Sequence, residues 1–238
     1  MNRVVFFLFF IFSTLYGYDA PYRLDKFQDI LQKSKLQAPL SIYDARWGTK
    51  YGEFKYYANQ YFYLQDDNYM VFEVCGYKHR SELREKRNWR VSTQKEKILD
   101  AEVYFFPLNQ EKELTFLQIH SNPKFSEDNR SKINKPLLRV TWYKEHHNLK
   151  DHLWAVVRMS ANPDEKRYVK IDLGKMKKDF VAIKVVVCSS HLKLFVDNIL
   201  KVDMDVSYWK YIWNYFKAGV YLQGKGCSKV LFRKLEIE

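Results

Sequence analysis

Glycine, proline and cysteine are scarce in this chain of 238 residues, which contains 8 Gly, 6 Pro and 3 Cys. So few glycines and prolines exclude collagen-like and low-complexity architectures. Long hydrophobic runs are also missing: the run from Val4 to Phe12 is too short to span a bilayer as a helix, and no other segment is long enough. The composition leaves a globular protein, and all-β chains of this length commonly form one domain.

Cys75, Cys188 and Cys227 cannot all pair within one chain. In an oxidising compartment we expect one disulfide and one buried thiol. Cys188 ends an apolar, strand-like run and Cys227 lies in a glycine-flanked segment that we expect to be a loop, so we predict a disulfide between these two residues. The sequence has no CxxC motif, and its histidines match no ligand spacing. We therefore predict no metal and no cofactor.

Positive charge and aromatic side chains are abundant. Lys and Arg number 40 against 28 Asp and Glu, which gives a formal net charge of +12, and aromatic residues make up 17% of the chain. A hydrophobic content of 47% excludes a disordered basic tail, because this much apolar surface must be buried. The chain should bind a polyanion, and composition leaves open nucleic acid, an anionic membrane or an acidic polysaccharide.

The N-terminal segment is typical of a secretory signal. Asn2 and Arg3 form a short positive start before the hydrophobic run from Val4 to Phe12, and Gly17 and Ala20 are candidate cleavage positions. We predict a signal peptide over residues 1–20 and a single domain over residues 21–238; an uncleaved N-terminal anchor is the alternative. We therefore expect a secreted or periplasmic protein that meets neither nucleic acid nor, after signal removal, a membrane.

The periodicity of hydrophobic residues is mostly two, which is typical of strands. One short amphipathic helix is expected from Leu24 to Leu31, before Pro39. Strands are expected at 61–64, 69–74, 101–106, 114–120, 137–143, 153–159, 181–188 and 230–237, with a hairpin over 192–204 that turns at Asp197 and Asn198. This pattern predicts an all-β sandwich of two antiparallel sheets.

Three further strand-like segments each combine a polar row with an apolar row, because successive side chains of a strand alternate between its faces. The polar rows consist of Arg80, Glu82 and Arg84 in the first segment, Gln118 and His120 in the second, and Tyr215, Lys217, Tyr221 and Gln223 in the third. Side by side in one sheet, these rows would line a groove with Arg, Gln, His, Lys and Tyr.

The same three segments resemble the signature motifs of the alginate lyases of polysaccharide lyase family 7, in the order of that family. They read RSELR from Arg80, QIH from Gln118 and YFKAGVYLQ from Tyr215. The resemblance runs from about Phe27 to the C-terminus and is weakest before Tyr61. It departs at Leu222, where many members carry Asn. The resemblance implies a β-jelly roll whose concave face is the substrate groove.

The resemblance also implies a lyase that cleaves the 4-O-glycosidic bond of alginate by β-elimination. A base removes the C5 proton, the leaving oxygen at C4 is protonated, and the product carries an unsaturated uronate at its non-reducing end. Arg80 and Gln118 can stabilise the negative charge that develops on the substrate carboxylate. His120 suits the base, and Tyr221 suits the acid. If the substrate is mannuronate, Tyr221 could serve in both roles.

The remaining polar residues are candidates for substrate binding. We expect Arg84 and Lys217 to hold neighbouring uronate carboxylates, and Glu82 to be an orienting ion-pair partner rather than an acid, because two guanidinium groups flank it. Tyr215 and Gln223 are also candidate contacts. For Tyr215 packing is the alternative, and for Gln223 it is a hydrogen bond within the sheet.

These observations predict an exported alginate lyase that acts as a monomer on an acidic polysaccharide. Ile119, in the QIH form of the second motif, resembles members that prefer guluronate-containing blocks. The alternatives are a lyase for another polyuronate and a non-catalytic module that binds acidic polysaccharide. The presence of Gln118, His120 and Tyr221 favours an enzyme, since binding alone requires neither a base nor an acid.

Overall fold

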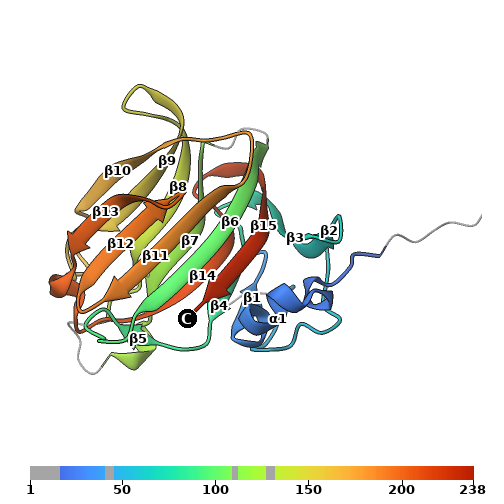
Figure 1. Ribbon diagram of the computed structural model, residues 1–238, viewed down its shortest axis with the longest axis horizontal. Coiled ribbons are helices and arrows are strands. Elements are labelled where there is room, and N and C mark those ends of the chain that lie inside the picture. The colour runs from blue at the N-terminus through green and yellow to red at the C-terminus, as the bar shows by residue number, and fades with distance from the viewer. Residues whose placement is uncertain (1–16, 41–45, 109–111, 127–131) are drawn as a thin grey trace, which may run out of the picture.

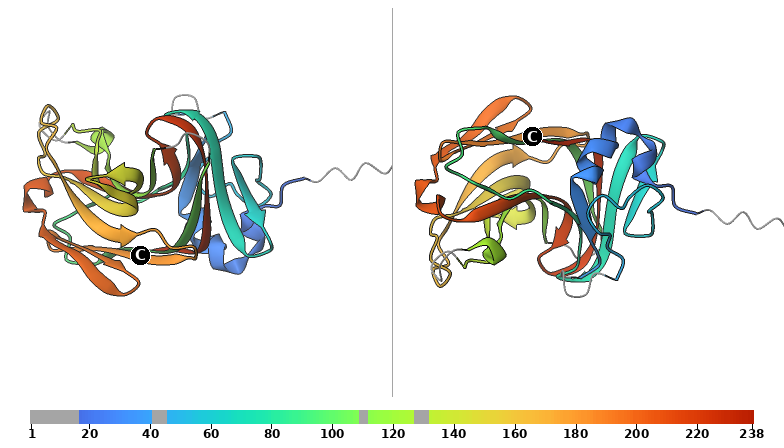
Figure 2. Two further views of the ribbon diagram at one scale, coloured as in Figure 1. Left: turned by 90° about the horizontal axis from the view of Figure 1, so that it is seen from above. Right: turned by 90° about the horizontal axis from the view of Figure 1, so that it is seen from below.

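The computed structural model describes residues 17–40, 46–108, 112–126 and 132–238. Most of the predicted signal segment, residues 1–16, lies outside the described residues. The described chain forms a sandwich of two antiparallel sheets, with one N-terminal helix beside it (Figures 1 and 2). The predicted fold class, a β-jelly-roll sandwich, is confirmed.

The first sheet, here called the groove sheet, carries the three polar rows. Its strands in spatial order are β1 (Ser34–Gln37), β4 (Arg80–Glu85), β14 (Trp213–Leu222), β7 (Glu113–Ser121), β8 (Pro136–His146), β9 (Leu149–Arg158) and β10 (Tyr168–Lys175), and β5 (Trp89–Arg90) pairs with β14. The neighbouring strands β4, β14 and β7 come from distant parts of the sequence, so the sheet unites motifs that the chain separates.

The second sheet packs against the inner face of the groove sheet. Its strands in spatial order are β13 (Ile199–Asp205), β12 (His191–Val196), β11 (Val181–Cys188), β6 (Lys97–Leu108), β15 (Lys225–Ile237), β3 (Tyr69–Tyr77) and β2 (Phe62–Gln65). The predicted hairpin is confirmed: Asp197 and Asn198 both have positive φ angles, as a tight two-residue turn requires.

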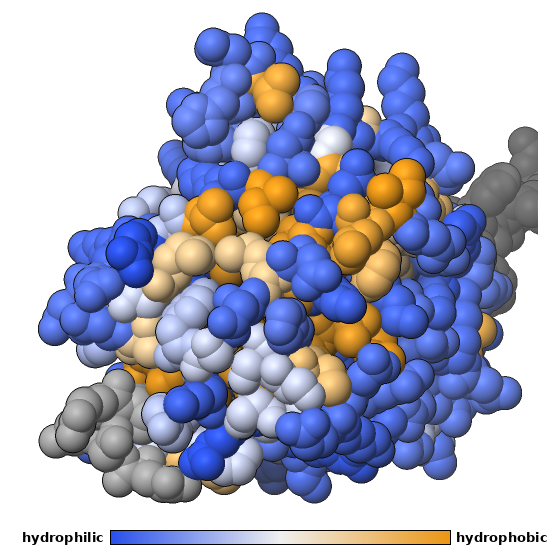
Figure 3. Space-filling model, turned by 60° about the vertical axis from the view of Figure 1, so that its left-hand side comes forward, coloured by the Kyte–Doolittle hydropathy of each residue, from blue (hydrophilic) through white to orange (hydrophobic). Residues whose placement is uncertain are grey.

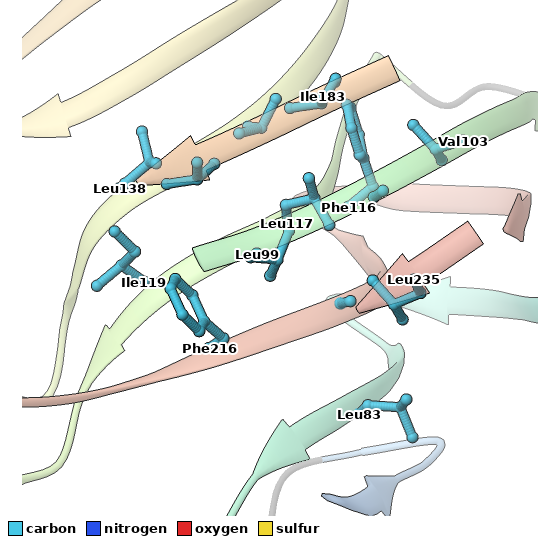
Figure 4. Close-up of a cluster of buried hydrophobic side chains, with 14 of the residues drawn as sticks. Leu83, Leu99, Val103, Phe116, Leu117, Ile119, Leu138, Ile183, Phe216 and Leu235 are labelled. Atoms are coloured by element: carbon cyan, nitrogen blue, oxygen red, sulfur yellow. The ribbon is translucent and has the colours of Figure 1, made fainter. Parts of the chain in front are cut away.

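The core lies between the two sheets and is built from the apolar rows of their strands. Leu83, Ile119 and Phe216 on the groove sheet face Leu99 and Leu235 on the second sheet (Figure 4), and all five are at most 1% exposed. Because each apolar side chain points inward, its sequence neighbours must point outward. The core thereby fixes which side chains reach the groove.

The N-terminal region adds the helix α1 (Asp25–Gln32) and the strand β1. The helix buries Phe27, Ile30 and Leu31, which share one face at a spacing of three and four residues. The expected helix is confirmed, whereas β1 was not predicted, since four residues are too few to show a period. Three short 3₁₀ helices complete the described elements: Pro21–Arg23, Pro123–Phe125 and Ser207–Trp209.

The predicted disulfide was wrong. Cys227 lies within β15, directly opposite Cys75 on β3, with their Cα atoms 4.0 Å apart, and these two residues are bonded. Cys188 is the free thiol, and its Sγ lies 3.2 Å from the carbonyl oxygen of Gln94. The error arose because Cys227 was assigned to a loop; the cross-strand pairing of β3 with β15 is a long-range contact that no local pattern reveals.

The surface is predominantly hydrophilic, as the space-filling view from the side of β10 and β13 shows, with a band of hydrophobic residues across it (Figure 3). Ile199 and Leu200 of β13 are among the exposed hydrophobic residues, at 60% and 47% exposure. Within the described ranges, no helix has the length and apolar character needed to cross a membrane.

Candidate active site

Strand pairing brings the three polar rows together on one face of the groove sheet. On β14, Lys217 lies opposite Arg84 of β4 on one side and opposite Gln118 of β7 on the other. Directly opposed residues of antiparallel strands point to the same face. The predicted convergence of the three motifs is therefore confirmed.

A cavity of about 400 Å³ lies over this face. It is lined by Gln37, Arg80, Gln118, His120, Asn134, Lys135, Pro136, Arg139, Tyr168, Tyr215, Lys217, Tyr221 and Gln223. Seven of the nine predicted site residues are in this lining. The two others are Glu82, which lies beneath the surface, and Arg84, which lies beside the cavity over Tyr215.

The irregular register of β7 shapes the groove. Phe116 is an extra residue relative to β8, whereas on the β14 side two residues, Gly219 and Val220, stand opposite it. Phe116 and Leu117 both point into the core. Strict alternation therefore fails at this bulge but holds again for Gln118 and His120, which face the groove as predicted.

On the other side of β14, Gly219 allows close approach to β4. Its φ is +142°, and a Cβ there would lie 2.2 Å from the carbonyl oxygen of Ser81. Only glycine fits this position. The close approach keeps Tyr221 in register with Arg80, whose guanidinium lies over the Tyr221 ring at 4.5 Å from its centroid. The Arg80 guanidinium and the Tyr221 phenol are therefore in contact in the groove.

His120 is held in the form that a base requires. Its Nδ1 lies 2.8 Å from the carbonyl oxygen of Ser121, and because a carbonyl can only accept, we assign the proton to Nδ1 and the lone pair to Nε2. Burial, followed by repulsion from Lys217, lowers the pKa of His120 to about 3. The imidazole is therefore neutral at physiological pH.

Tyr215 supports His120 from the neighbouring strand. The two rings stack at 5.5 Å between centroids, and the Tyr215 hydroxyl lies 3.3 Å from Nδ1 of His120. Burial raises the pKa of Tyr215 to about 12, so this phenol keeps its proton. The Arg84 guanidinium lies over the Tyr215 ring, 4.1 Å from its centroid. These contacts favour the packing interpretation of Tyr215.

Glu82 is a buried acceptor beneath the groove, at 1% exposure. Gln118 donates from Nε2 to one of its carboxylate oxygens, and Lys217 donates from Nζ to the other. Nη1 of Arg80 lies 3.6 Å from the second oxygen. The Glu82 carboxylate is enclosed, and the predicted contact of Glu82 with substrate stays a prediction. Its predicted role as an orienting ion-pair partner agrees with these contacts.

The contacts of Glu82 determine the state of two groove residues. Since a carboxylate accepts and does not donate, the amide nitrogen of Gln118 must face Glu82, which fixes the orientation of that side chain. Lys217 is 2% exposed, and burial lowers its pKa to about 8 although the Glu82 carboxylate opposes this shift. Lys217 is thus held mainly by Glu82, and its binding of a uronate carboxylate stays a prediction.

Gln223 and several unpredicted residues complete the site. Gln223 donates from Nε2 to the hydroxyl of Thr115 at 3.1 Å, which agrees with the alternative of a hydrogen bond within the sheet. Arg139 lies opposite Gln118 and donates from Nη1 to Glu113 at 3.0 Å. The alternation of 137–143 contained a signal for Arg139, a charged residue between buried Leu138 and Val140.

Gln37 and Tyr168 also line the cavity, and no local pattern indicated either residue. Gln37 belongs to the unpredicted strand β1. Tyr168 begins the unpredicted strand β10, and its hydroxyl accepts a hydrogen bond of 2.8 Å from Nη1 of Arg158. Gln37 reaches the groove through the pairing of β1 with the distant strand β4, and Tyr168 through the pairing of β10 with the preceding strand β9.

Comparison with known proteins agrees with this site. The family described as "Alginate lyase" matches residues 30–238. An alginate lyase of a Photobacterium species is 29% identical over an alignment of 259 positions, gaps included, which covers 92% of this chain and 87% of the relative. The solved structure of alginate lyase AlyC3 is 30% identical with a TM-score of 0.81, covering 93% of this chain and 95% of AlyC3.

A more distant structure shows the same fold. Alginate lyase A1-II′, a member of polysaccharide lyase family 7, is 19% identical with a TM-score of 0.72, covering 90% of this chain and 97% of A1-II′. The family match includes all three motifs and the strands that carry them. The chain therefore belongs to the alginate lyase family and is a polysaccharide lyase with a jelly-roll fold.

Proposed function

We propose that this chain cleaves alginate by β-elimination, with His120 as the base and Tyr221 as the acid. The observation that carries the proposal is the state of His120: it is neutral, with Nδ1 held by Ser121 and Nε2 left as the acceptor, in the same cavity as Arg80, Gln118 and Tyr221. A neutral imidazole in a groove of cations is suited to taking a proton from an anionic sugar.

The reaction needs no water. Nε2 of His120 takes the C5 proton, the electrons of the broken C5–H bond form the C4–C5 double bond, and the bond between C4 and the glycosidic oxygen breaks. Tyr221 gives its proton to the departing oxygen. Arg80 and the second amide N–H of Gln118 are the groups that would stabilise the charge developing on the C5 carboxylate, as oxyanion-hole donors do.

For block preference we propose guluronate-containing linkages. In guluronate the C5 proton and the leaving oxygen lie on opposite faces of the ring, so two separate groups are needed. His120 and Tyr221 come from different strands and meet that need. Ile119, which suggested this preference in the sequence, is fully buried in the core and does not touch the groove. The preference would then come from the proton-transfer pair.

A second candidate is mannuronate-containing alginate, where proton and leaving oxygen share one face and Tyr221 would act as both base and acid. It is favoured by one observation: AlyC3, at 28% identity and a TM-score of 0.80, has been solved in complex with dimannuronate. The Arg80 guanidinium over the Tyr221 ring would stabilise a phenolate in that mechanism.

We also propose that the protein is exported and acts as a monomer on the acidic polysaccharide. Export is supported by the hydrophobic run from Val4 to Phe12. Fractionation of cells and chromatography of the purified chain would test these two points.

The test of the proposed function uses separated guluronate and mannuronate blocks, with ultraviolet absorbance of the unsaturated product as the signal. We expect faster cleavage of guluronate blocks and loss of that activity in His120→Asn. Faster cleavage of mannuronate blocks that survives His120→Asn would establish the second candidate. If alginate gives no increase in absorbance and another polyuronate does, both candidate functions are overturned.

A further inference from the structure

The strand β1 extends the groove sheet beyond the three motifs. Its Leu36 points into the core, so Lys35 and Gln37 point to the groove face. Gln37 lines the main cavity and also a second hollow of about 440 Å³, which Lys35 lines as well. The two hollows therefore adjoin at Gln37. Lys35 lies on the edge strand of the sheet, separated from Lys217 of β14 by Arg84 of β4.

At this end of the groove, two cationic side chains each lie over a tyrosine ring. Lys35 lies opposite Arg84 in the pairing of β1 with β4, so the two side chains are neighbours. The Lys35 ammonium is 5.1 Å from the centroid of the Tyr51 ring, and the Arg84 guanidinium is 4.1 Å from that of Tyr215. The rings favour these positions of the two cations, and the cations give the charge that a uronate needs.

Among the described residues, Lys35 forms no ion pair with a carboxylate. Burial lowers the pKa of Lys35, and repulsion from Arg84 and Lys124 lowers it further.

The acids nearby are Glu53 and Glu85. Glu53 lines the second hollow without an ion pair to Lys35. The carboxylate of Glu85 is buried, and it accepts hydrogen bonds from Nε1 of Trp89 at 3.1 Å and from the backbone nitrogen of Phe216 at 3.0 Å. A bound anion would therefore relieve the mutual repulsion of the three cations.

We propose that Lys35 and Tyr51 form an outer subsite, in which the Lys35 ammonium binds the carboxylate of a uronate residue remote from the bond that is cleaved. The subsite deepens the proposed function and rests on it, because it assumes that the groove holds a polyuronate. A subsite of this kind contributes to binding of the whole polysaccharide and leaves the chemical step unchanged.

The experiment compares wild type with Lys35→Met, which keeps the length of the side chain, and with Lys35→Arg, which keeps the charge. Lys184→Met is the matched control, since Lys184 is an exposed lysine on β11 of the other sheet. Kinetics are measured on polymeric alginate and on the shortest oligosaccharide that is cleaved. Calorimetry at low salt measures the binding of an oligouronate that has a reduced reducing end and that the enzyme does not cleave.

For Lys35→Met we expect KM on the polymer to rise roughly three- to tenfold with kcat unchanged, as for loss of one partly exposed charged contact. The shortest oligosaccharide, Lys35→Arg and Lys184→Met should behave as wild type does. An unchanged KM on the polymer, or an equal loss of kcat on every length, would overturn the subsite. If wild type cleaves no polyuronate the proposed function fails, whereas weaker calorimetric binding by Lys35→Met would still support the subsite.

Discussion

The substitution Glu82→Gln tests whether a buried carboxylate organises the floor of the groove. Glu82 accepts from Gln118 and Lys217 at once and is 1% exposed, and Lys217 is 2% exposed. The variant keeps the shape of the side chain but leaves a buried ammonium without its counter-charge. Removing one partner of a buried ion pair costs about 3 to 5 kcal/mol when the other charge stays.

The magnitude follows from the state of Lys217. Its pKa is already lowered to about 8, with Glu82 as the main group that raises it. Without Glu82 the pKa of Lys217 should fall further, so Lys217 loses its proton near neutral pH. The loss of unfolding free energy should then lie at the lower end of this range, about 3 kcal/mol. For a chain of this size, that corresponds to a fall in melting temperature of roughly 6 to 12 °C.

The assay is thermal unfolding followed by circular dichroism, together with kcat and KM on alginate. We expect kcat to fall as well, because the glutamine introduced at position 82 no longer fixes the orientation of the Gln118 amide. The double variant Glu82→Gln/Lys217→Met removes the unpaired ammonium and should recover part of the stability but not kcat. A single variant with the melting temperature and kcat of wild type would refute the role of Glu82.

Three further predictions concern the proton-transfer pair and the disulfide. Tyr221→Phe should lower kcat by at least about 100-fold while binding of uncleaved oligosaccharide persists, as for loss of a general acid; near-normal turnover would remove Tyr221 from the mechanism. The pH profile of kcat/KM should show no protonation step near pH 6.5, because burial lowers the pKa of His120 to about 3. Between pH 6.5 and 3 the unfolded chain binds this proton and the folded chain does not, so His120 should also make stability fall as the pH is lowered through that window; an acid limb near pH 6.5 in the kcat/KM profile of wild type would contradict the lowered pKa. Cys227→Ser, which opens a loop of 152 residues, should cost about 3 kcal/mol of unfolding free energy, whereas Cys188→Ser should cost almost none; equal effects would contradict the pairing of Cys75 with Cys227.

Alternation along single strands was enough to predict much of the groove. It placed Arg80, Gln118, His120 and Tyr221 on one face because their apolar neighbours had to enter the core. The same rule found the strands with long regular patterns, such as 181–188, and the turn at Asp197 and Asn198.

What could not be predicted depends on pairing between distant strands. The strand β1 is too short for a period, so Lys35 and Gln37 were missed, and the pairing of β3 with β15 that joins Cys75 to Cys227 leaves no local trace. The enclosure of Glu82 is a similar case: alternation gives the face of a side chain but not the depth at which its neighbours cover it.

The central claim is that a neutral His120 and Tyr221 carry out an elimination in the groove. Its most direct test is digestion of alginate in water enriched in heavy oxygen, followed by mass spectrometry of the products. The mechanism predicts products that contain an unsaturated uronate and, when their reducing ends are reduced at once so that C1 cannot exchange its oxygen with water, no heavy oxygen. Wild type should form these products and Tyr221→Phe should not. Incorporation of heavy oxygen at the cleaved bond would show hydrolysis and would contradict it.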